Sequence, residues 1–437
     1  MRVLILADSC NPEWPSLPAV TYNAVRAIAE LADVTVVTSV RNRENITKHG
    51  FGAANVEYVD TEYIAAPIYK FTNFIRGNEG AWTTVVALNY PSYIAFERDS
   101  YRRFRSQLQA GEFDLVHRMS PMSPTTPSYI AKRLKHRHNI PFVLGPINGG
   151  LRWPTEFRQE RRSEREWLSY LRNAYKLLPY YGSTYRDATA ILASFSHTVN
   201  ELPEQARPRI IDFPEVGYDP ELFSSVTHRE TGMEKMILVA GRLVPLKLPD
   251  VTVEAFARSP TLQKHRLVVV GDGPLKFQME QRIKSAGLSE RVTFTGNLRQ
   301  AEVGEWMRKT DIFSFPTIRE LGAGALIEAM ACGMACVTVD YGAPATLITD
   351  ELGVKVPLGD KESITVAVQH ALEELVENEE RIRTLGNNAR QHVEKLFTWQ
   401  AKAKFTLRVY EWALGRGEKP HFWDQNMSAG HDLLDTP

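Results

Sequence analysis

The chain has 437 residues, of which 43% are hydrophobic and 24% charged, and its 52 basic residues balance 52 acidic ones. These proportions are typical of an ordinary soluble globular protein, and the length indicates two or three domains. No apolar run reaches the roughly eighteen residues that span a bilayer, and the start MRVLILADS becomes polar too soon for a signal peptide. The cysteines have no His or Cys cluster beside them and are typical of core residues in a cytosolic protein.

The balance of charge conceals a basic region in the first half. Between Tyr101 and Lys176 there are fifteen Lys or Arg residues and six Asp or Glu residues, an excess of nine positive charges. The remainder of the chain therefore carries nine net negative charges. We expect part of the first half to attract anions.

The first elements predict a βαβ unit. An apolar strand over Arg2–Ala7 precedes an amphipathic helix over Val20–Leu31 and a β-branched strand over Val34–Val40. A dinucleotide-binding motif would need glycines in the turn after the first strand, but the first glycine of the chain is Gly50. This excludes a Rossmann-type NAD site.

Further strands follow in the first half. Residues 41–110 have weak periodicity, and we predict no elements there. Strands are predicted over 113–117, 141–144, 191–194 and 209–213. The strand over 141–144 runs into a loop with Asn148, Gly149 and Gly150, where glycines let the backbone approach a ligand.

Residues 152–186 are rich in Arg, Trp and Tyr. Apolar residues recur there at helical spacing, namely Trp167, Leu168, Leu171, Tyr175 and Leu178. A basic amphipathic helix can lie on an anionic membrane or face an anionic acceptor. A core-facing helix with a solvated basic side fits as well, because glutamates are interspersed among the arginines.

A second domain is predicted after the polar linker 224–234. Its first strand, Met236–Val239, leads to Arg242 and Lys247, and a helix begins near Pro249. Arg binds phosphate through two hydrogen bonds and Lys supplies a point charge, so the two suit a nucleotide diphosphate. Further strands are predicted over 267–273 and 292–298, and charged helices over 361–397.

Residues 311–340 predict a strand, a loop, a helix over 324–332 that Gly333 ends, and a second strand. Unpaired N–H groups at the helix start lie at the carboxyl end of a strand, where open α/β sheets bind anions. Glu320 and Glu328 flank this site. Because carboxylates repel phosphate, we assign them to sugar hydroxyls. Alternatively, Glu328 is a solvated helix residue and Glu320 an acid favoured at the helix start.

This stretch resembles the nucleotide-sugar site of the family 4 (group 1) glycosyltransferases, which share an E-x7-E signature followed by EAMACG. The GRLVPLK stretch at Arg242 and Lys247 is similar to another motif of the family, and Val216–Phe223 to its interdomain segment. The resemblance covers about residues 1–415. It implies the α/β GT-B fold, in which Rossmann-like parallel-sheet domains over 1–225 and 226–398 face each other across a cleft. A helix over 399–415 would cross back to the first domain, and a polar tail over 416–437 would follow.

The resemblance implies retaining transfer of a hexose from a UDP- or GDP-sugar to an acceptor hydroxyl. It assigns catalytic roles to His117, Arg242, Lys247 and Glu320. The donor-binding residues would also include Gly273, Asn297, Leu298, Gly322, Ala323, Gly324, Ala325 and Glu328, and the loop Asn148, Gly149 and Gly150 would lie on the acceptor side. No Asp-x-Asp pair occurs in the sequence, so we expect neither a metal nor another cofactor.

The sequence departs from the family at three places. Pro12–Pro15 stand where glycines are usual in the first loop, which argues against backbone contact from that side and indicates an unusual acceptor pocket. Ala323 replaces a common glycine, which we interpret as a shifted glycine-rich loop. Arg118 follows His117 where a small residue is more usual.

Other functions stay open, namely a non-catalytic relative that binds sugar nucleotides and a GT-B nucleotide-sugar epimerase or phosphorylase. The implied partners are a nucleotide-sugar donor and an acceptor glycan, glycolipid or other hydroxyl compound. The basic segment indicates contact with an anionic membrane, and the sequence contains no recognisable nucleic-acid-binding module. We expect a cytoplasmic protein, or one peripheral at the inner membrane face, in cell-envelope polysaccharide synthesis.

Overall fold

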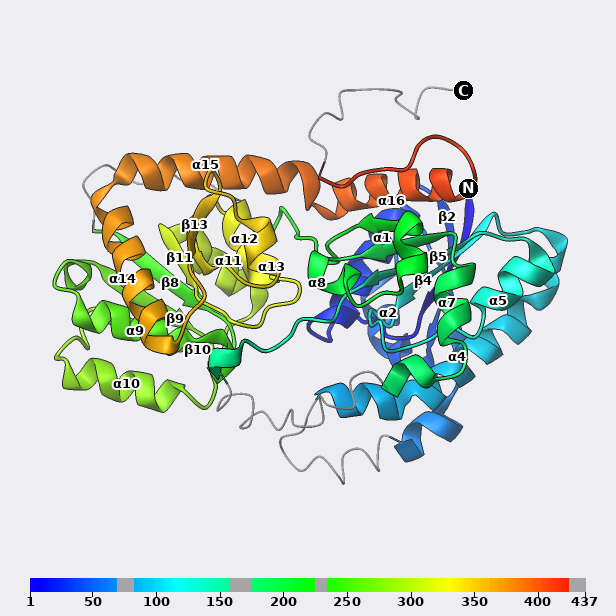
Figure 1. Ribbon diagram of the computed structural model, residues 1–437, viewed down its shortest axis with the longest axis horizontal. Helices are drawn as coiled ribbons and strands as arrows, with labels where there is room; N and C mark the ends of the chain where they lie inside the picture. Colours follow the sequence, from blue (N-terminus) through cyan, green and yellow to red (C-terminus); the bar gives the residue numbers. More distant parts are fainter. Residues whose placement is uncertain (69–81, 158–173, 225–233, 424–437) are drawn as a thin grey trace.

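A computed structural model describes residues 1–68, 82–157, 174–224 and 234–423, with the backbone alone for 82–89. Most of the basic segment predicted as a helix around Trp167 lies outside these ranges. Two parallel sheets form the framework, one of seven strands and one of six (Figure 1). The predicted GT-B architecture of two Rossmann-like sheets is thereby confirmed.

The first sheet has the strand order β3-β2-β1-β4-β5-β6-β7. Its strands are β1 (Arg2–Ala7), β2 (Asp33–Ser39), β3 (Asn55–Val59), β4 (Leu115–Ser120), β5 (Phe142–Ile147), β6 (Ala190–Ala193) and β7 (Ile210–Asp212). Its helices include α1 (Leu17–Ala29), α2 (Arg43–His49), α4 (Trp82–Ala110), α5 (Ala131–Arg133), α7 (Tyr181–Asp187) and α8 (Ser196–Val199).

The second sheet has the strand order β10-β9-β8-β11-β12-β13. Its strands are β8 (Met236–Ala240), β9 (Arg266–Val270), β10 (Val292–Gly296), β11 (Ile312–Phe315), β12 (Ala335–Val339) and β13 (Gly353–Val356). Its helices are α9 (Pro249–Arg258), α10 (Lys276–Ser285), α11 (Gln300–Lys309), α12 (Gly324–Ala331), α13 (Ala343–Leu347), α14 (Lys361–Glu377) and α15 (Glu379–Leu396), and α16 (Trp399–Ala413) follows them.

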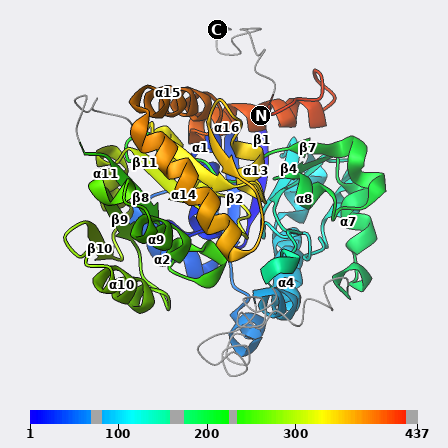
Figure 2. The same cartoon turned by 60° about the vertical axis from the view of Figure 1, so that its left-hand side comes forward.

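Both sheets are covered on both faces, which explains their nearly unbroken apolar strands. In β1, Val3 and Ile5 pack on the side of α1 and α16, whereas Leu4 and Leu6 pack on the side of α4 and α7. The second sheet likewise packs α9, α10 and α14 on one face and α11 and α12 on the other (Figure 2).

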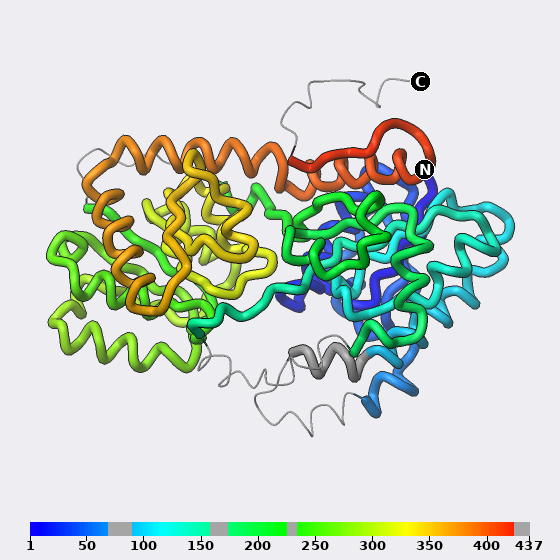
Figure 3. The backbone as a smooth tube through the Cα atoms, viewed as in Figure 1, coloured from blue at the N-terminus to red at the C-terminus, as the bar shows by residue number. Residues whose placement is uncertain are grey.

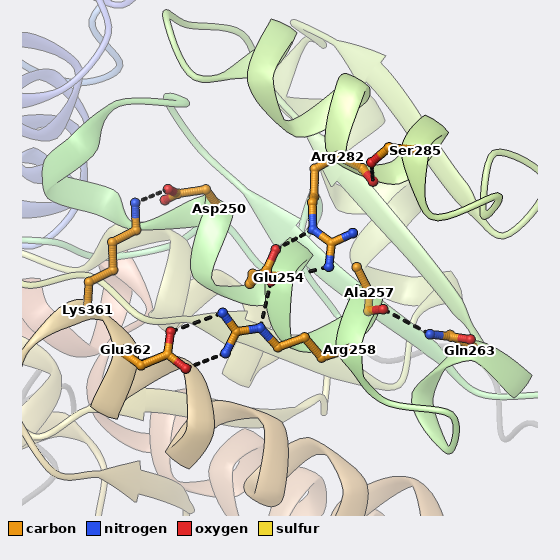
Figure 4. Close-up of polar contacts among 9 residues, drawn as sticks. All are labelled: Asp250, Glu254, Ala257, Arg258, Gln263, Arg282, Ser285, Lys361 and Glu362. Atoms are coloured by element: carbon orange, nitrogen blue, oxygen red, sulfur yellow. Dashed lines mark hydrogen bonds and ion pairs between the residues drawn. The ribbon is translucent and has the colours of Figure 1, made fainter.

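Ion pairs tie together the helices on the outer face of the second sheet (Figure 4). Glu254 of α9 accepts hydrogen bonds from Arg282 Nε of α10 at 2.5 Å and from Arg258 Nε at 2.6 Å. Arg258 also donates to Glu362 of α14, at 3.0 Å from Nη2 to Oε2. Because these pairs are partly exposed, each contributes about 1 kcal/mol or less to stability, and their role is to align the helices.

Two segments of the chain connect the domains, one at Tyr218 and one at Thr398, and they lie side by side. A β-bridge pairs Tyr218 with Thr398, and Tyr218 N donates to Phe397 O at 3.0 Å. From there α16 runs back and packs against α1 of the first domain, as predicted (Figures 1 and 3).

The C-terminal segment departs from the prediction of a polar tail over 416–437. Within its described part, Phe422 is 3% exposed. Its ring packs edge-on against Phe213 and Phe405, with centroids 5.6 and 5.2 Å away. The chain therefore continues to cover the first domain as far as Trp423.

None of the helices within the described ranges is long and apolar enough to cross a membrane.

Candidate active site between the domains

Each sheet has one point where the strand order reverses, at β1/β4 and at β8/β11. Open α/β sheets bind ligands outside the carboxyl ends of the strands at such points. A cavity of about 300 Å³ lies at the β8/β11 point, lined by Arg242, Lys247 and Glu320 together with Gly324 and Ala325 of the α12 start. Ser16, from the loop before α1, lines the same cavity, so both domains contribute to it.

Lys247 and Glu320 form an ion pair in this cavity between Nζ and Oε2. Their side chains are 20% and 15% exposed, so the pair is largely shielded from water. The Lys247 ammonium also lies 5.5 Å from the centroid of Phe315. Arg242 follows β8 and is exposed toward the cavity. The two predicted phosphate-binding cations therefore share one cavity with the first carboxylate of the E-x7-E pair.

The loop from Pro316 to Ala323, here the 316–323 loop, is held from within. Ala323 N donates to Glu320 Oε1 at 3.1 Å, and Ala343 N donates to Glu320 O at 3.0 Å. Ala323 has φ +53°, the left-handed conformation that glycine adopts more readily. The residue that replaces the usual glycine thus keeps a glycine-like backbone, and α12 starts directly after it.

Glu328 lies on α12, where Gln300 Nε2 donates to its Oε1 at 3.1 Å. Burial raises the pKa of Glu328 to about 7, and the Gln300 hydrogen bond partly opposes this. Glu328 does not line the 300 Å³ cavity, and neither do five other predicted donor residues: Gly273, Asn297, Leu298, Gly322 and Ala323. A ligand that touched them would have to extend beyond this cavity.

His117 does not stand where the sequence analysis expects it. β4 continues to Ser120, so His117 lies inside the strand rather than at its end. The side chain is fully buried, with Nε2 2.6 Å from Gly145 O and Nδ1 2.6 Å from Tyr410 Oη of α16. Because a carbonyl only accepts, Nε2 carries the proton and Nδ1 accepts from Tyr410. His117 is a structural contact between β4, β5 and α16 and does not line the 300 Å³ cavity, so this geometry favours a structural residue over the predicted catalytic role.

The side chain of Arg118 lies on the opposite face of β4 from that of His117, and its surroundings there explain why an arginine occupies this position. Its side chain is 1% exposed, its Nη1 donates to Thr126 O at 2.5 Å, and its guanidinium lies 5.6 Å from the Tyr93 centroid. The buried carboxylate of Glu97 is the nearby negative charge, and it accepts from Ser128 Oγ at 2.9 Å. This departure from the family pattern is therefore a buried polar contact with α4.

Asn148 of the predicted acceptor-side loop reaches the second domain. Its Nδ2 donates to Glu215 Oε1 at 2.5 Å and to Leu321 O at 2.9 Å. Gly149 is held by Thr198, whose Oγ1 donates to its carbonyl at 2.9 Å. Gly150 has φ +87° and packs against Glu201. This loop is thus part of the domain interface.

The chain after Gly150 crosses onto the second domain (Figure 3). Tyr341 Oη donates to Arg152 O at 2.8 Å, and the Arg319 guanidinium lies 5.2 Å from the Trp153 ring centroid. Phe157 is 1% exposed within the core of the second sheet. Residues 151–157 therefore brace the 316–323 loop from the side of the first domain.

Sequence reasoning missed two residues of this region. Ser16 has φ +70° and ψ −137°, a conformation almost confined to glycine, which fits the usual glycines at this loop. Glu215 is buried behind Gly322, and an isolated glutamate before the Val216–Phe223 segment carries no signal in the sequence. Ser16, which follows Pro12–Pro15, lines the cavity, so the first loop reaches this site in spite of its prolines.

The two facing Rossmann-like sheets define the GT-B class of proteins. Residues 223–392 match the model of the family described as glycosyl transferases group 1. The structure is similar to HepE of Anabaena, solved in complex with UDP, with a TM-score of 0.62 and 14% identity over 94% of this chain and 100% of that one.

Two sequence relatives have assigned activities. One is the D-inositol 3-phosphate glycosyltransferase of Jonesia denitrificans, 31% identical over 40% of this chain and 42% of that protein. The other is the N-acetyl-alpha-D-glucosaminyl L-malate synthase of Bacillus anthracis, 30% identical over 38% of this chain and 42% of that protein. The chain thus matches less than half the length of either relative.

Proposed function

We propose that this protein transfers a hexose from a UDP- or GDP-sugar to an acceptor hydroxyl with retention of configuration at the anomeric carbon. The observation that carries the proposal is the cavity at the β8/β11 point, where Arg242, Lys247, Glu320 and the start of α12 meet. The match of residues 223–392 to the group 1 glycosyl transferases and the names of the relatives support it.

Within this proposal, Arg242 and Lys247 bind the diphosphate. Arg242 donates two parallel hydrogen bonds to phosphate oxygens, and Lys247 provides a compact charge once phosphate competes for its ammonium. The unpaired N–H groups at Gly324 and Ala325 add the positive end of the α12 dipole. These groups stabilise the charge that develops on the departing phosphate. Since the sequence lacks an Asp-x-Asp pair, we propose that transfer needs no metal.

Glu320 accepts hydrogen bonds from donor-sugar hydroxyls and fixes the orientation of the ring, and Glu328 accepts from the ribose. In the reaction the bond from the anomeric carbon to the phosphate oxygen breaks. A bond to the acceptor oxygen forms on the same face, and the acceptor proton passes to the leaving phosphate oxygen. The products are a glycoside and a nucleoside diphosphate.

The acceptor enters from the first domain in this scheme. The names of the two relatives point to small anionic hydroxyl compounds, inositol phosphate and malate. A lipid-linked or polysaccharide acceptor, and contact of residues 152–186 with an anionic membrane, stay predictions. They depend largely on residues outside the described ranges.

The experiment is turnover of UDP-glucose, UDP-galactose, UDP-N-acetylglucosamine and GDP-mannose, each with a panel of hydroxyl acceptors, with and without EDTA. We expect one donor to yield an α-linked product and nucleoside diphosphate at a rate that EDTA does not change. Release of an epimerised donor would support the epimerase instead. Saturable donor binding without any product from the panel would favour a non-catalytic relative.

A further inference from the structure

A buried carboxylate lies directly behind the 316–323 loop. Glu215 belongs to the segment that carries the chain from the first domain to the second, and it is 3% exposed. A Cβ added at Gly322 would lie 2.3 Å from Glu215 Oε1, so the carboxylate packs against the backbone of the loop. Burial raises the pKa of Glu215, and the nearby Lys402 ammonium opposes this shift.

The same carboxylate oxygen fixes Asn148. Both hydrogens of the Asn148 amide have acceptors, Glu215 Oε1 at 2.5 Å and Leu321 O at 2.9 Å. An asparagine amide could turn over and present its oxygen instead, but a carboxylate only accepts hydrogen bonds. Glu215 Oε1 and Leu321 O both accept from this amide, so together they keep the nitrogen of Asn148 directed at them.

Leu321 is the residue after Glu320. The hydrogen bonds that Glu320 itself accepts, from Lys247 Nζ, Ala323 N and Ala343 N, come from within the second domain. The bond from Asn148 comes from the first domain, on which the acceptor is expected to bind.

We propose that Glu215 is a positioning residue for sugar transfer and acts through Asn148. The inference rests on the proposed function and adds a residue to it. Glu215 and Asn148 fix the position of the donor sugar, which Glu320 orients, relative to the acceptor side of the cleft. Because transfer requires the acceptor oxygen and anomeric carbon to be aligned closely, a shift of about 1 Å in the loop lowers the rate by roughly a hundredfold.

The test compares Glu215→Ala, Glu215→Gln, Asn148→Ala and the double alanine variant, with Glu221→Ala as a control on an exposed carboxylate of the same segment. Two quantities are measured: the kcat and KM for the nucleotide sugar that the wild type turns over, and the Kd of the matching free nucleoside diphosphate.

We expect Glu215→Ala and Asn148→Ala to lower kcat about tenfold to a hundredfold while the Kd changes less than about threefold. Glu215→Gln should restore most of the rate, since its amide oxygen can still accept from Asn148. The double variant should lose no more than the worse single variant, because both remove one shared interaction. Glu221→Ala should behave like the wild type.

An unchanged kcat in Glu215→Ala would overturn the proposal. So would equal losses of kcat and diphosphate affinity that Glu215→Gln does not relieve, since these would indicate a general structural role. Failure of the wild type to turn over any of the four nucleotide sugars is a different result, which would contradict the proposed function itself.

Discussion

Lys247 and Glu320 are joined by an ion pair across the cavity, although the one is assigned to phosphate and the other to sugar. The pair lies at the β8/β11 point, between the turn after β8 and the 316–323 loop. Glu320 thus has two roles in the proposed scheme. It places the Lys247 ammonium before the donor arrives, and it accepts from the sugar once phosphate draws the ammonium away.

Glu320→Gln separates these roles. The variant keeps the shape and one acceptor oxygen but removes the charge that holds Lys247, so nucleoside diphosphate should bind as tightly as in the wild type or up to about threefold more tightly. Sugar orientation should suffer, and kcat should fall by about a hundredfold or more. Calorimetry with UDP and GDP and rates with the preferred donor give the two numbers. A variant with wild-type kcat would refute the role of Glu320.

Gly322 offers a test of the loop geometry. Any side chain there would meet Glu215, whereas Gly182 of α7 has open space around its Cβ position and serves as the control. Gly322→Ala should displace the loop and lower kcat/KM for the donor about tenfold or more, while Gly182→Ala should not. Equal activity of the two variants would show that the Glu215 side chain moves aside and that the position of the loop is not critical for activity.

The raised pKa of Glu328, about 7, predicts a pH dependence of donor affinity. Above pH 7 the carboxylate is ionised and accepts from both ribose hydroxyls, whereas below pH 7 it is protonated and accepts less well. The Kd of the donor should therefore rise about threefold to tenfold between pH 8 and pH 6. Glu328→Gln should bind more weakly at pH 8 and show a flat profile. A steep profile in that variant would assign the titration to another group.

His117 predicts acid sensitivity of the fold. Burial lowers its pKa from 6.5 to about 4, so the unfolded chain takes up a proton between these values and the folded chain does not. The free energy of unfolding should therefore fall as pH drops from 6.5 to 4, by up to about 3 kcal/mol. Urea titrations should show a steeper fall in the wild type than in His117→Gln, which keeps other histidines with lowered pKa values, such as His138, His265 and His392.

The same variant tests whether His117 is structural or catalytic. At pH 7.5 we expect His117→Gln to be less stable than the wild type by about 1–3 kcal/mol, because Tyr410 and Gly145 lose a well-fitted partner. Its kcat/KM should stay within about threefold of the wild type, since the ring does not reach the cavity. A hundredfold loss of activity in a folded variant would restore the catalytic assignment.

The second sheet and its site could be predicted from sequence because their signals are local. Arg242 and Lys247 follow a buried strand by a few residues, and Glu320 precedes a helix whose end is marked by Gly333. The start of α9 at Pro249 could be predicted for the same reason, whereas the return of α16 to the first domain was implied only by the family resemblance.

The first domain was harder because its decisive contacts are distant in the chain. The strand predicted over 113–117 ends before Arg118, yet β4 continues to Ser120 and the Arg118 charge is buried near Glu97. Asn148 contacts residues 67 and 173 positions away, which no local pattern encodes.

The most direct test of the central claim is calorimetric titration of the wild type and Arg242→Ala with UDP, GDP and their sugars, in EDTA. The account predicts saturable 1:1 binding of at least one of these ligands to the wild type. It also predicts a Kd roughly tenfold to a hundredfold higher in Arg242→Ala, since a charge-assisted hydrogen bond contributes about 1.5–3 kcal/mol. Arg381→Ala, on the outer surface of α15, should match the wild type. Absence of binding, or binding that Arg242→Ala leaves unchanged, would contradict the assignment of the cavity to a nucleotide sugar.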